Sequence, residues 1–231
     1  MIVVVTGASG ALGGTLSRRL VKAGHKVAAL GSAGAGLDAL GAELGAACLA
    51  VPLDLRAPAA WASALPAIEA ALGAPDGAVL CAGGWAGGHA FWEAPEGELS
   101  GMLAANLDTA QQSLRALLPG MVARGRGSVV VIGSRAVERP WSSTNAAAYA
   151  ASKSGLVALA QVVAAEVLEK GVRINAVLPS TIATAANRAA MPAAEQARWV
   201  TAESLSEVIA FLLSDASRDV SGAAIPVYGR A

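Results

Sequence analysis

Apolar positions along the chain follow two alternating patterns, short continuous runs and longer stretches with helical spacing. The continuous Val-, Ile-, Leu- and Ala-rich runs predict buried strands. These runs lie at residues 2–6, 26–30, 47–53, 77–81, 128–132, 172–178 and 223–228. Between them apolar residues recur at helical spacing, as Leu12, Leu16 and Leu20 do after the first run. The helices expected on this basis cover residues 11–23, a short stretch ending at Leu44, and residues 57–72, 98–123, 144–170 and 204–214.

Strands that alternate with helices predict an α/β protein. Such alternation favours a parallel sheet whose strands are joined by right-handed crossovers. We therefore expect a single Rossmann-type, doubly wound parallel β-sheet of about seven strands, flanked by helices on both faces. No shift in composition and no repeat divides the 231 residues, so one domain is expected to span residues 1–231.

The charge balance argues against nucleic acid and membrane surfaces as partners. The chain carries 17 Lys and Arg against 17 Asp and Glu, so no basic excess favours either surface. Its long uncharged stretches are broken by Gly, Pro, Ser or Asn, and none predicts a membrane span. The first strand leaves no room for a signal peptide, and Cys48 and Cys81 lie in apolar surroundings typical of reduced core thiols. We expect a soluble cytoplasmic protein without a metal site.

A glycine-rich turn joins the first strand to the first helix. Residues Thr6 to Gly13 read TGASGALG. Glycines in this context let the backbone approach a diphosphate closely, and the helix N-terminus supplies amide donors and a favourable dipole. The turn therefore predicts nucleotide binding rather than a purely structural role. The residues expected to contact the cofactor here are Gly7, Ser9, Gly10, Ala11, Leu12 and Gly13.

The ends of the next strands predict the remainder of a dinucleotide site, because ligands bind beyond the carboxyl ends of parallel strands. Asp54 and Leu55 follow the third strand, where the carboxylate can accept from an adenine amino group, cap the next helix, or do both. Ala82, Gly83 and Gly84 follow the fourth strand, where small residues let a ribose or adenine pack on the backbone.

The end of the second strand bears on the choice between NAD and NADP. An acid at this point would bind the ribose 2′-hydroxyl and repel a 2′-phosphate. The chain has Gly31 and Ser32 here, with no acid before Asp38. Ser32 can donate to a phosphate, although no Arg or Lys lies in this loop. We expect NAD(P) as the cofactor, with NADP favoured over NAD.

Tyr149 and Lys153 stand four residues apart in a segment predicted to be helical, so both lie on one face. The pKa of a free phenol, about 10, is too high for proton exchange near neutrality. A nearby ammonium is expected to lower the Tyr149 pKa and make the pair a general acid/base. The spacing also occurs by chance in helices that pair an exposed lysine with a packing tyrosine.

Taken together, these features resemble the short-chain dehydrogenase/reductase family over essentially the whole chain. The turn from Thr6 to Gly13 resembles its nucleotide-binding turn, although Ala11 stands where the commonest form has glycine. The resulting TGxxGxxG spacing is more usual among the family's longer sugar-nucleotide members, whose extra C-terminal substrate region this chain lacks. The other matching positions follow in the family's order: Asn106, Ser134, Tyr149, Lys153, Pro179 and Thr184.

A narrower resemblance is to dihydropteridine reductases, which reduce quinonoid dihydrobiopterin with NADH. It rests on the glycine-rich stretch 82–88 and on residues 178–192. Two positions depart from that group. Its members carry an acid where Gly31 stands, and they lack the catalytic serine that Ser134 restores. A retained serine favours a carbonyl or another less activated substrate.

The family resemblance implies hydride transfer from a nicotinamide to a carbonyl, or to a C=N bond of a pterin-like ring. Tyr149 would donate the proton, Lys153 would lower its pKa and hold the nicotinamide ribose, and Ser134 would bind the substrate oxygen. Asn106 would hold a water that relays protons to Lys153. Pro179 and Thr184 would hold the nicotinamide end.

The resemblance also implies a substrate lid around residues 180–203. The residues expected at the substrate pocket are Trp85, Trp141, Arg188 and Met191. Trp85 is equally consistent with a core aromatic residue.

Other functions stay open at this point. A non-catalytic dinucleotide sensor can use the same fold, although an intact set of Ser134, Tyr149 and Lys153 argues against it. A sugar-nucleotide epimerase is disfavoured by the short C-terminal region. The helices at 98–123 and 144–170 are apolar around their circumference, and family members commonly pair through them, so we expect a homodimer or homotetramer.

Overall fold

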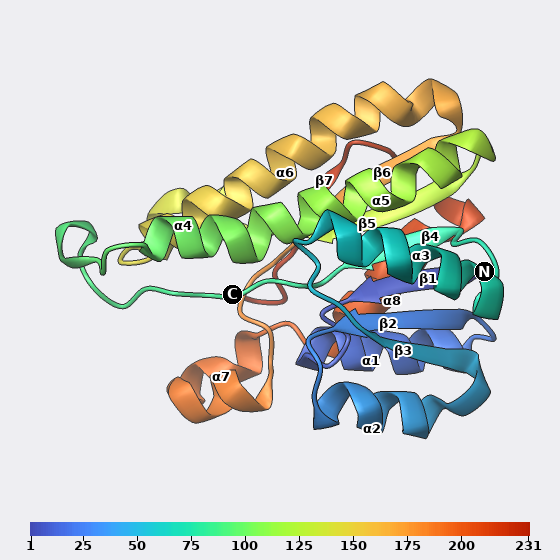
Figure 1. Ribbon diagram of the computed structural model, residues 1–231. Coiled ribbons are helices and arrows are strands. Elements are labelled where there is room, and N and C mark those ends of the chain that lie inside the picture. Colours follow the sequence, from blue (N-terminus) through green and yellow to red (C-terminus); the bar gives the residue numbers. More distant parts are fainter.

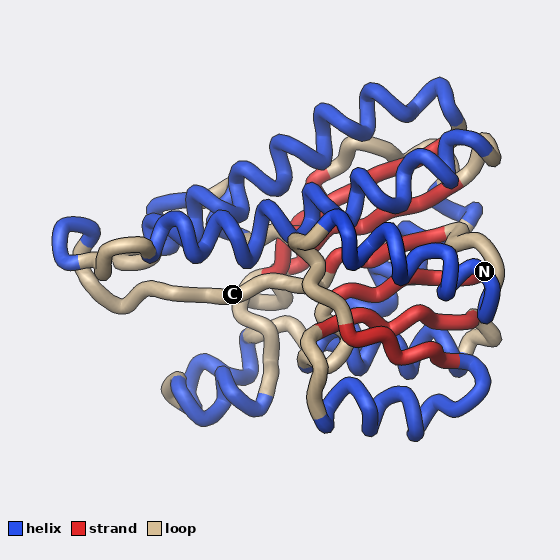
Figure 2. Tube along the Cα trace, in the orientation of Figure 1, coloured by secondary structure: helices blue, strands red, loops and turns tan.

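The computed structural model describes residues 1–231 as one seven-stranded sheet with the strand order β3-β2-β1-β4-β5-β6-β7. All neighbouring strands pair in parallel (Figures 1 and 2). The strands are β1 (Ile2–Thr6), β2 (Lys26–Gly31), β3 (Cys48–Pro52), β4 (Gly77–Leu80), β5 (Gly127–Ile132), β6 (Val172–Pro179) and β7 (Ala224–Val227). The predicted doubly wound α/β fold is confirmed.

Helices cover both faces of the sheet. One face carries α1 (Ala11–Lys22), α2 (Ala35–Leu44) and α8 (Ala202–Leu213), and the other carries α3 (Pro58–Leu72), α5 (Thr109–Ala123) and α6 (Ala147–Val167) (Figure 1). Helix α4 (Glu98–Leu103) lies in line with α5 beyond the ends of the strands and packs on α6. Each face has its own buried apolar cluster. Successive β1 residues alternate between the clusters, Val4 in one and Val3 and Val5 in the other, as the two-residue period of a strand requires. Burial on both faces explains the continuous apolar runs.

The strand order reverses between β1 and β4, which are neighbours although β2 and β3 separate them in the chain. Ligands of doubly wound sheets bind in the crevice at such a switch point, beyond the carboxyl ends of the strands. The turn after β1 and the loop after β4 both open here. The amide of Ala82 donates a 3.2 Å hydrogen bond to Thr6 Oγ1, which ties the two together.

The predicted helix over 98–123 is interrupted. A π-helical turn over Ala104–Asp108 separates α4 from α5 and contains Asn106, which is completely buried. A π-turn widens the helix by one residue and commonly marks a functional site. Its polar partners lie in distant parts of the chain, so local periodicity does not predict it.

The segment without clear periodicity, residues 180–200, holds more structure than its pattern suggests. It contains α7 (Ala185–Ala190) and a 3₁₀ turn over Ala193–Arg198. A single parallel bridge between Ile182 and Val200 closes its base. Figure 1 shows α7 standing apart from the two helical layers, on the side where the strands end.

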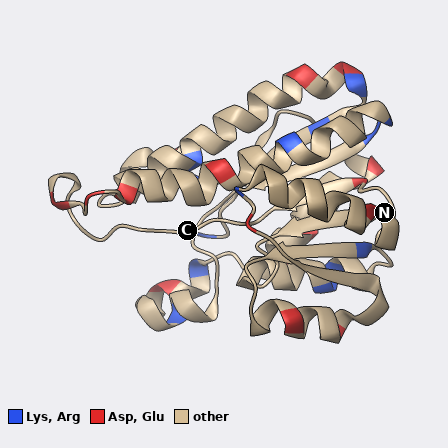
Figure 3. Ribbon diagram, in the orientation of Figure 1, with Lys and Arg blue, Asp and Glu red and all other residues tan.

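The helix that contains α6, Ala147–Lys170, is long and apolar enough to cross a membrane by length and composition. This differs from the expectation that no stretch qualifies. Its buried residues Leu156, Ala160 and Ala164 belong to the apolar cluster of one sheet face, where α6 packs on β6. Only 39% of its apolar stretch is buried, so packing on the sheet accounts for part of its composition. Charges of both signs are scattered over the surface (Figure 3).

Candidate active site and cofactor groove

The glycine turn after β1 leaves no room for side chains. Gly7 adopts a φ of +63°, and a Cβ at this position would stand 2.8 Å from the amide nitrogen of Ala82. A Cβ on Gly13 would collide with the Gly7 carbonyl oxygen and approach Ala8 Cα to 2.8 Å. The backbone here is therefore packed as tightly as a dinucleotide-binding turn requires.

Three amides at the start of α1 are free to bind an anion. No backbone or side-chain group accepts a hydrogen bond from the amides of Ala11, Leu12 and Gly13, and the preceding Gly10 supplies no capping side chain. Free amides and the helix dipole favour a diphosphate at this point. The site residues thus fit the NAD(P) cofactor that the sequence predicts.

A cavity of about 900 Å³ opens beyond the ends of β1 to β4. The predicted residues that line it are Gly7, Ser9, Gly10, Gly31, Ser32, Asp54, Leu55, Ala82 and Gly83. Its other lining residues include Cys81, Ala105, Thr109 and Arg56. Arg56 was not among the residues expected to line the cofactor site, although it directly follows Asp54 and Leu55. The cavity has the size and lining expected for the adenosine half of a dinucleotide.

Asp54 already has partners within its own loop. Its Oδ1 accepts hydrogen bonds from the Arg56 amide at 3.0 Å and from Arg56 Nε at 3.3 Å. These bonds, the backbone one first, lower the pKa of the Asp54 carboxyl below its usual value. Asp54 thus bonds only within its own loop, and the predicted cap of the next helix is wrong, because Ala57 is the N-cap of α3 and no side chain caps that helix. The second carboxylate oxygen of Asp54 is left for an adenine amino group.

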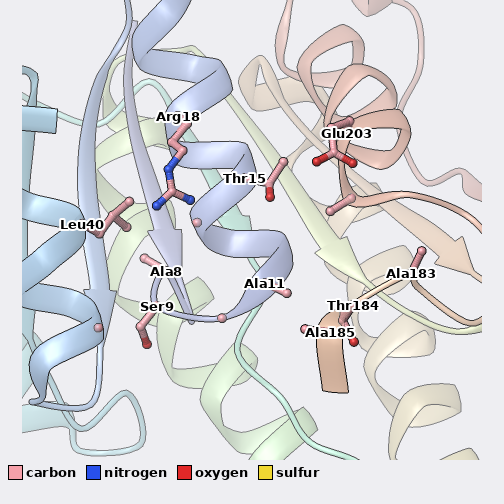
Figure 4. A pocket seen from close by; sticks show the side chains of 14 residues that line it. Ala8, Ser9, Ala11, Thr15, Arg18, Leu40, Ala183, Thr184, Ala185 and Glu203 are labelled. Carbon is pink, nitrogen blue, oxygen red and sulfur yellow. The ribbon is translucent and has the colours of Figure 1, made fainter. Parts of the chain in front are cut away.

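A second cavity, of about 320 Å³, lies against the glycine turn between α1, α2, the start of α7 and the start of α8 (Figure 4). Ser9 and Gly10 line both cavities, while Thr184 and Glu203 line only this one. Thr184 also caps α7, because its hydroxyl accepts from the Asn187 amide at 3.1 Å. Pro179 is buried at the end of β6 and lines neither cavity.

The predicted acid/base residues gather at the carboxyl end of β5. Ser134 follows β5 and is buried, with its Oγ accepting from the Ala136 amide at 3.2 Å. Tyr149 lies in the first turn of α6 and Lys153 one turn later. Burial raises the pKa of Tyr149, and its hydrogen bond with Ser134 partly opposes this rise. The expected direction of the Tyr149 pKa is therefore wrong for the protein alone, because burial outweighs the effect of Ser134 and no charged neighbour contributes.

Lys153 is buried and directed at the end of β5. Its Nζ donates to the Ile132 carbonyl at 2.8 Å. Burial lowers the pKa of Lys153 to about 8, with a small opposing effect from Cys81. Burial also raises the pKa of Cys81 to about 12, so this free cysteine stays a neutral thiol.

Asn106 fastens the loop after β4 to α6. Its Oδ1 accepts from the Gly84 amide at 2.9 Å, and its Nδ2 donates to the Gly84 carbonyl at 3.1 Å and to Ser152 Oγ at 3.0 Å. Ser152 in turn donates to the Tyr149 carbonyl at 2.8 Å. A Cβ on Gly83 would collide with Asn106 Oδ1 and stand 3.3 Å from Lys153 Nζ. Asn106 and Lys153 are thus close together, as their predicted roles require.

The four residues expected at the substrate pocket lie on loops and on the lid. Trp85 is 63% exposed and Trp141 74% exposed, so a core role for Trp85 is wrong. The Gly88 amide donates to the Asn145 carbonyl at 2.8 Å, which joins the loops that carry the two tryptophans. Arg188 bonds Gln196 within the lid at 3.2 Å, and Met191 is partly buried. Their contact with a substrate stays a prediction.

A family model described as short chain dehydrogenase matches residues 1–195 of the chain. This protein belongs to the short-chain dehydrogenase family. It is 34% identical over 229 residues to a Xanthobacter autotrophicus protein named inactive 2-(S)-hydroxypropyl-CoM dehydrogenase 2, with 93% of this chain and 98% of that one covered. It is 28% identical over 236 residues to the 3-oxoacyl-(acyl-carrier-protein) reductase of Escherichia coli, with 99% and 96% covered.

A solved structure of a related reductase has a similar fold. The 3-ketoacyl-(acyl-carrier-protein) reductase of Brucella melitensis, crystallised with NADH, superposes with a TM-score of 0.88 at 25% identity. The match covers 99% of this chain and 96% of that one. The protein is accordingly an NAD(P)-dependent oxidoreductase. The narrower resemblance to dihydropteridine reductases finds no support among these relatives.

Proposed function

We propose that this protein reduces a carbonyl group of a small molecule, with Tyr149 as the proton donor. The observation that carries the proposal is the gathering of Ser134, Tyr149 and Lys153 at the end of β5, with Asn106 beside Lys153. The adjoining glycine turn and the cavity of about 900 Å³ supply room for the cofactor. We propose NADP as the preferred form of that cofactor.

Each residue of the set has a distinct task in this proposal. Tyr149 donates a proton to the substrate oxygen, and its raised pKa keeps that proton in place at neutral pH. The amide of Ala136 donates to Ser134 Oγ, and the Ser134 hydroxyl, which pairs with Tyr149 in the free protein, turns its proton to the same substrate oxygen when the substrate binds. Lys153 places a charge near the nicotinamide ribose, and Asn106 holds a proton-relaying water. A bound NAD(P)H supplies the hydride.

The substrate class follows from the side chains around this centre. Trp85 and Trp141 are exposed on two loops that the Gly88–Asn145 hydrogen bond joins, and large apolar rings at a pocket favour an apolar or planar group next to the carbonyl. Arg188 and Met191 would complete the pocket from the lid over residues 180–203. The names of relatives point to 3-oxoacyl compounds, so 3-oxo esters and thioesters are the first substrates to test.

The test measures oxidation of NADPH and NADH with 3-oxo thioesters, small aldehydes and ketones, and quinonoid dihydropterin. We expect turnover with a carbonyl substrate that falls roughly a hundredfold in Tyr149→Phe and by a similar order in Ser134→Ala. Full activity in Tyr149→Phe would refute the assignment. Turnover of dihydropterin alone would support a pterin reductase instead.

A non-catalytic dinucleotide sensor is the competing function. One relative is named inactive, and the same fold can hold a cofactor without using it. Tight binding of NADPH without turnover of any compound in the panel would favour the sensor.

We also propose a cytoplasmic homodimer or homotetramer. Leu99 on α4 and Val162 on α6 are 51% and 60% exposed, and apolar side chains at such positions favour pairing between identical helices. Light scattering after gel filtration measures the assembly. Val162→Glu should shift it towards the monomer if α6 forms the interface, and Lys22→Glu, a charge change on the outer surface of α1, serves as control.

A further inference from the structure

We propose that Arg56 is the residue that binds the 2′-phosphate of NADP and sets the preference of this protein for NADP over NAD. This proposal rests on the proposed NADP-dependent function. The loop after β2 provides Ser32 but no basic side chain, and Arg56 lies in a different loop, the one after β3.

The sheet register brings Arg56 to the end of β2. Strands β2 and β3 are neighbours, and Gly31 pairs with Pro52 at their carboxyl ends. The two following loops therefore leave the sheet side by side. Ser32, Ala33 and Arg56 all line the same cavity of about 900 Å³. A ribose seated there meets the loop after β2 and the loop after β3 together.

The Arg56 guanidinium retains most of its hydrogen-bonding capacity. Its only ionic partner is Asp54, at 3.3 Å through Nε, and the side chain is 56% exposed. A guanidinium has five N–H donors, so four remain for a phosphate. An arginine fork matches phosphate oxygens in pairs, which makes it a strong ligand for a terminal phosphate.

The electrostatics at this end of the cavity favour a phosphate. No carboxylate follows β2 before Asp38, so nothing in the Ser32 loop repels a 2′-phosphate. Asp54 is the only acidic residue that lines the cavity. Its Oδ1 already accepts from the Arg56 amide and from Arg56 Nε. Ser32 adds a hydroxyl donor to the lining of the same cavity.

Arg18 is the alternative candidate near the turn, and its geometry argues against it. Its Nε and one of its two terminal nitrogens donate to the two carboxylate oxygens of Glu43, at 2.7 Å and 2.6 Å. It lines only the smaller cavity, together with Thr15 and Gly36 (Figure 4). A phosphate would have to displace a bidentate carboxylate to reach it.

The experiment measures dissociation constants by isothermal titration calorimetry on the full chain. The probes are NADPH and NADH, followed by adenosine 2′,5′-bisphosphate and 5′-AMP, which differ by the 2′-phosphate alone. We expect tighter binding of NADPH than of NADH. In Arg56→Gln we expect NADPH and the bisphosphate to bind roughly tenfold or more weaker, since a charge-assisted hydrogen bond is lost, while NADH and AMP change less than about twofold. Arg56→Lys should recover part of the loss, because it retains the charge without the fork.

The other outcomes overturn the proposal. Equal weakening of NADPH and NADH in Arg56→Gln would assign Arg56 to the adenine or to folding of its loop. Selective loss of NADPH binding in Arg18→Gln, with Arg56→Gln unaffected, would assign the phosphate to Arg18. Tighter binding of NADH than of NADPH by the unaltered protein would refute the inference and leave the reductase proposal intact. Binding of neither nucleotide would refute the proposed function itself.

Discussion

The Lys153 Nζ atom donates a 2.8 Å hydrogen bond to the carbonyl oxygen of Ile132, the last residue of β5. Lys153 is only 6% exposed, and no carboxylate contributes to its pKa shift. Burial lowers its pKa from 10.5 to about 8. At neutral pH the native protein therefore holds a buried ammonium one helical turn from Tyr149, and this arrangement destabilises the fold.

Replacement of Lys153 with Met should reveal this effect as a change in the pH dependence of stability. Between about pH 8 and 10.5 the unfolded chain binds more protons at this position than the native protein does, so Lys153 makes stability rise with pH across this window. The full destabilisation, on the order of 3 kcal/mol, applies below it. We expect the stability of Lys153→Met relative to the unaltered protein to fall by roughly 2–3 kcal/mol from pH 7 to pH 10.5.

Urea unfolding at several pH values measures this difference. The comparison across pH cancels the constant contribution of the Ile132 carbonyl, which loses its donor in Lys153→Met at every pH. A difference between the two proteins that does not change with pH would mean that the pKa of Lys153 is not lowered.

Two adjacent glycines should respond differently to alanine. A Cβ on Gly13 would collide with the Gly7 carbonyl and approach Ala8 Cα to 2.8 Å. A Cβ on Gly14 meets the flexible end of Arg18 at 3.1 Å and, in an ordinary contact, the Ala8 carbonyl oxygen at 3.5 Å. We expect Gly13→Ala to weaken NADPH binding by roughly a hundredfold or more through displacement of the turn, and Gly14→Ala to retain the fold and the binding. Fluorescence titration with NADPH measures both. Equal effects of the two substitutions would argue against a steric role of Gly13.

Local sequence patterns predict the strands, the glycine turn and the spacing of Tyr149 and Lys153, because each depends on residues close together in the chain. Features that depend on distant partners were not predicted. The π-turn contains Asn106, whose side-chain amide forms hydrogen bonds with Gly84 and Ser152, both far away in the chain. Arg56 and Ser32 line one cavity because β2 pairs with β3.

The direction of the Tyr149 pKa shift is likewise not predictable from local sequence. The four-residue spacing indicates a nearby ammonium, and that alone predicts a lowered pKa. In the structure burial raises the pKa instead, and Ser134, not the ammonium, is the group that opposes it. The degree of burial is a property of the tertiary structure, so the spacing alone gave the wrong sign.

The Asn106 side chain should stabilise the fold more than its neighbour Ser152 does. Asn106→Ala removes bonds to both backbone groups of Gly84 as well as the bond to Ser152. We expect a loss of about 2 kcal/mol or more in the free energy of unfolding, together with weaker NADPH binding as residues 82–88 loosen. Ser152→Ala removes single bonds to Asn106 and to the Tyr149 carbonyl and should lose about 1 kcal/mol. Denaturant unfolding measures both free energies. An Asn106→Ala variant as stable as Ser152→Ala would contradict the role of Asn106 in fastening the loop after β4 to α6.

An acid at the end of β2 should reverse the proposed cofactor preference. A Cβ on Gly31 would stand 3.6 Å from Ser9 Oγ, an ordinary contact, and Gly31 lines the cavity of about 900 Å³. Gly31→Asp therefore has room for a carboxylate that accepts from a ribose 2′-hydroxyl and repels a 2′-phosphate. We expect NADPH binding to weaken by roughly tenfold or more while NADH binding is retained or strengthened. Gly31→Ala carries the same Cβ without the charge and should leave the ratio of the two affinities unchanged. Calorimetric titration with both nucleotides measures that ratio, and the same shift in Gly31→Ala would attribute it to the shape of the cavity rather than to charge.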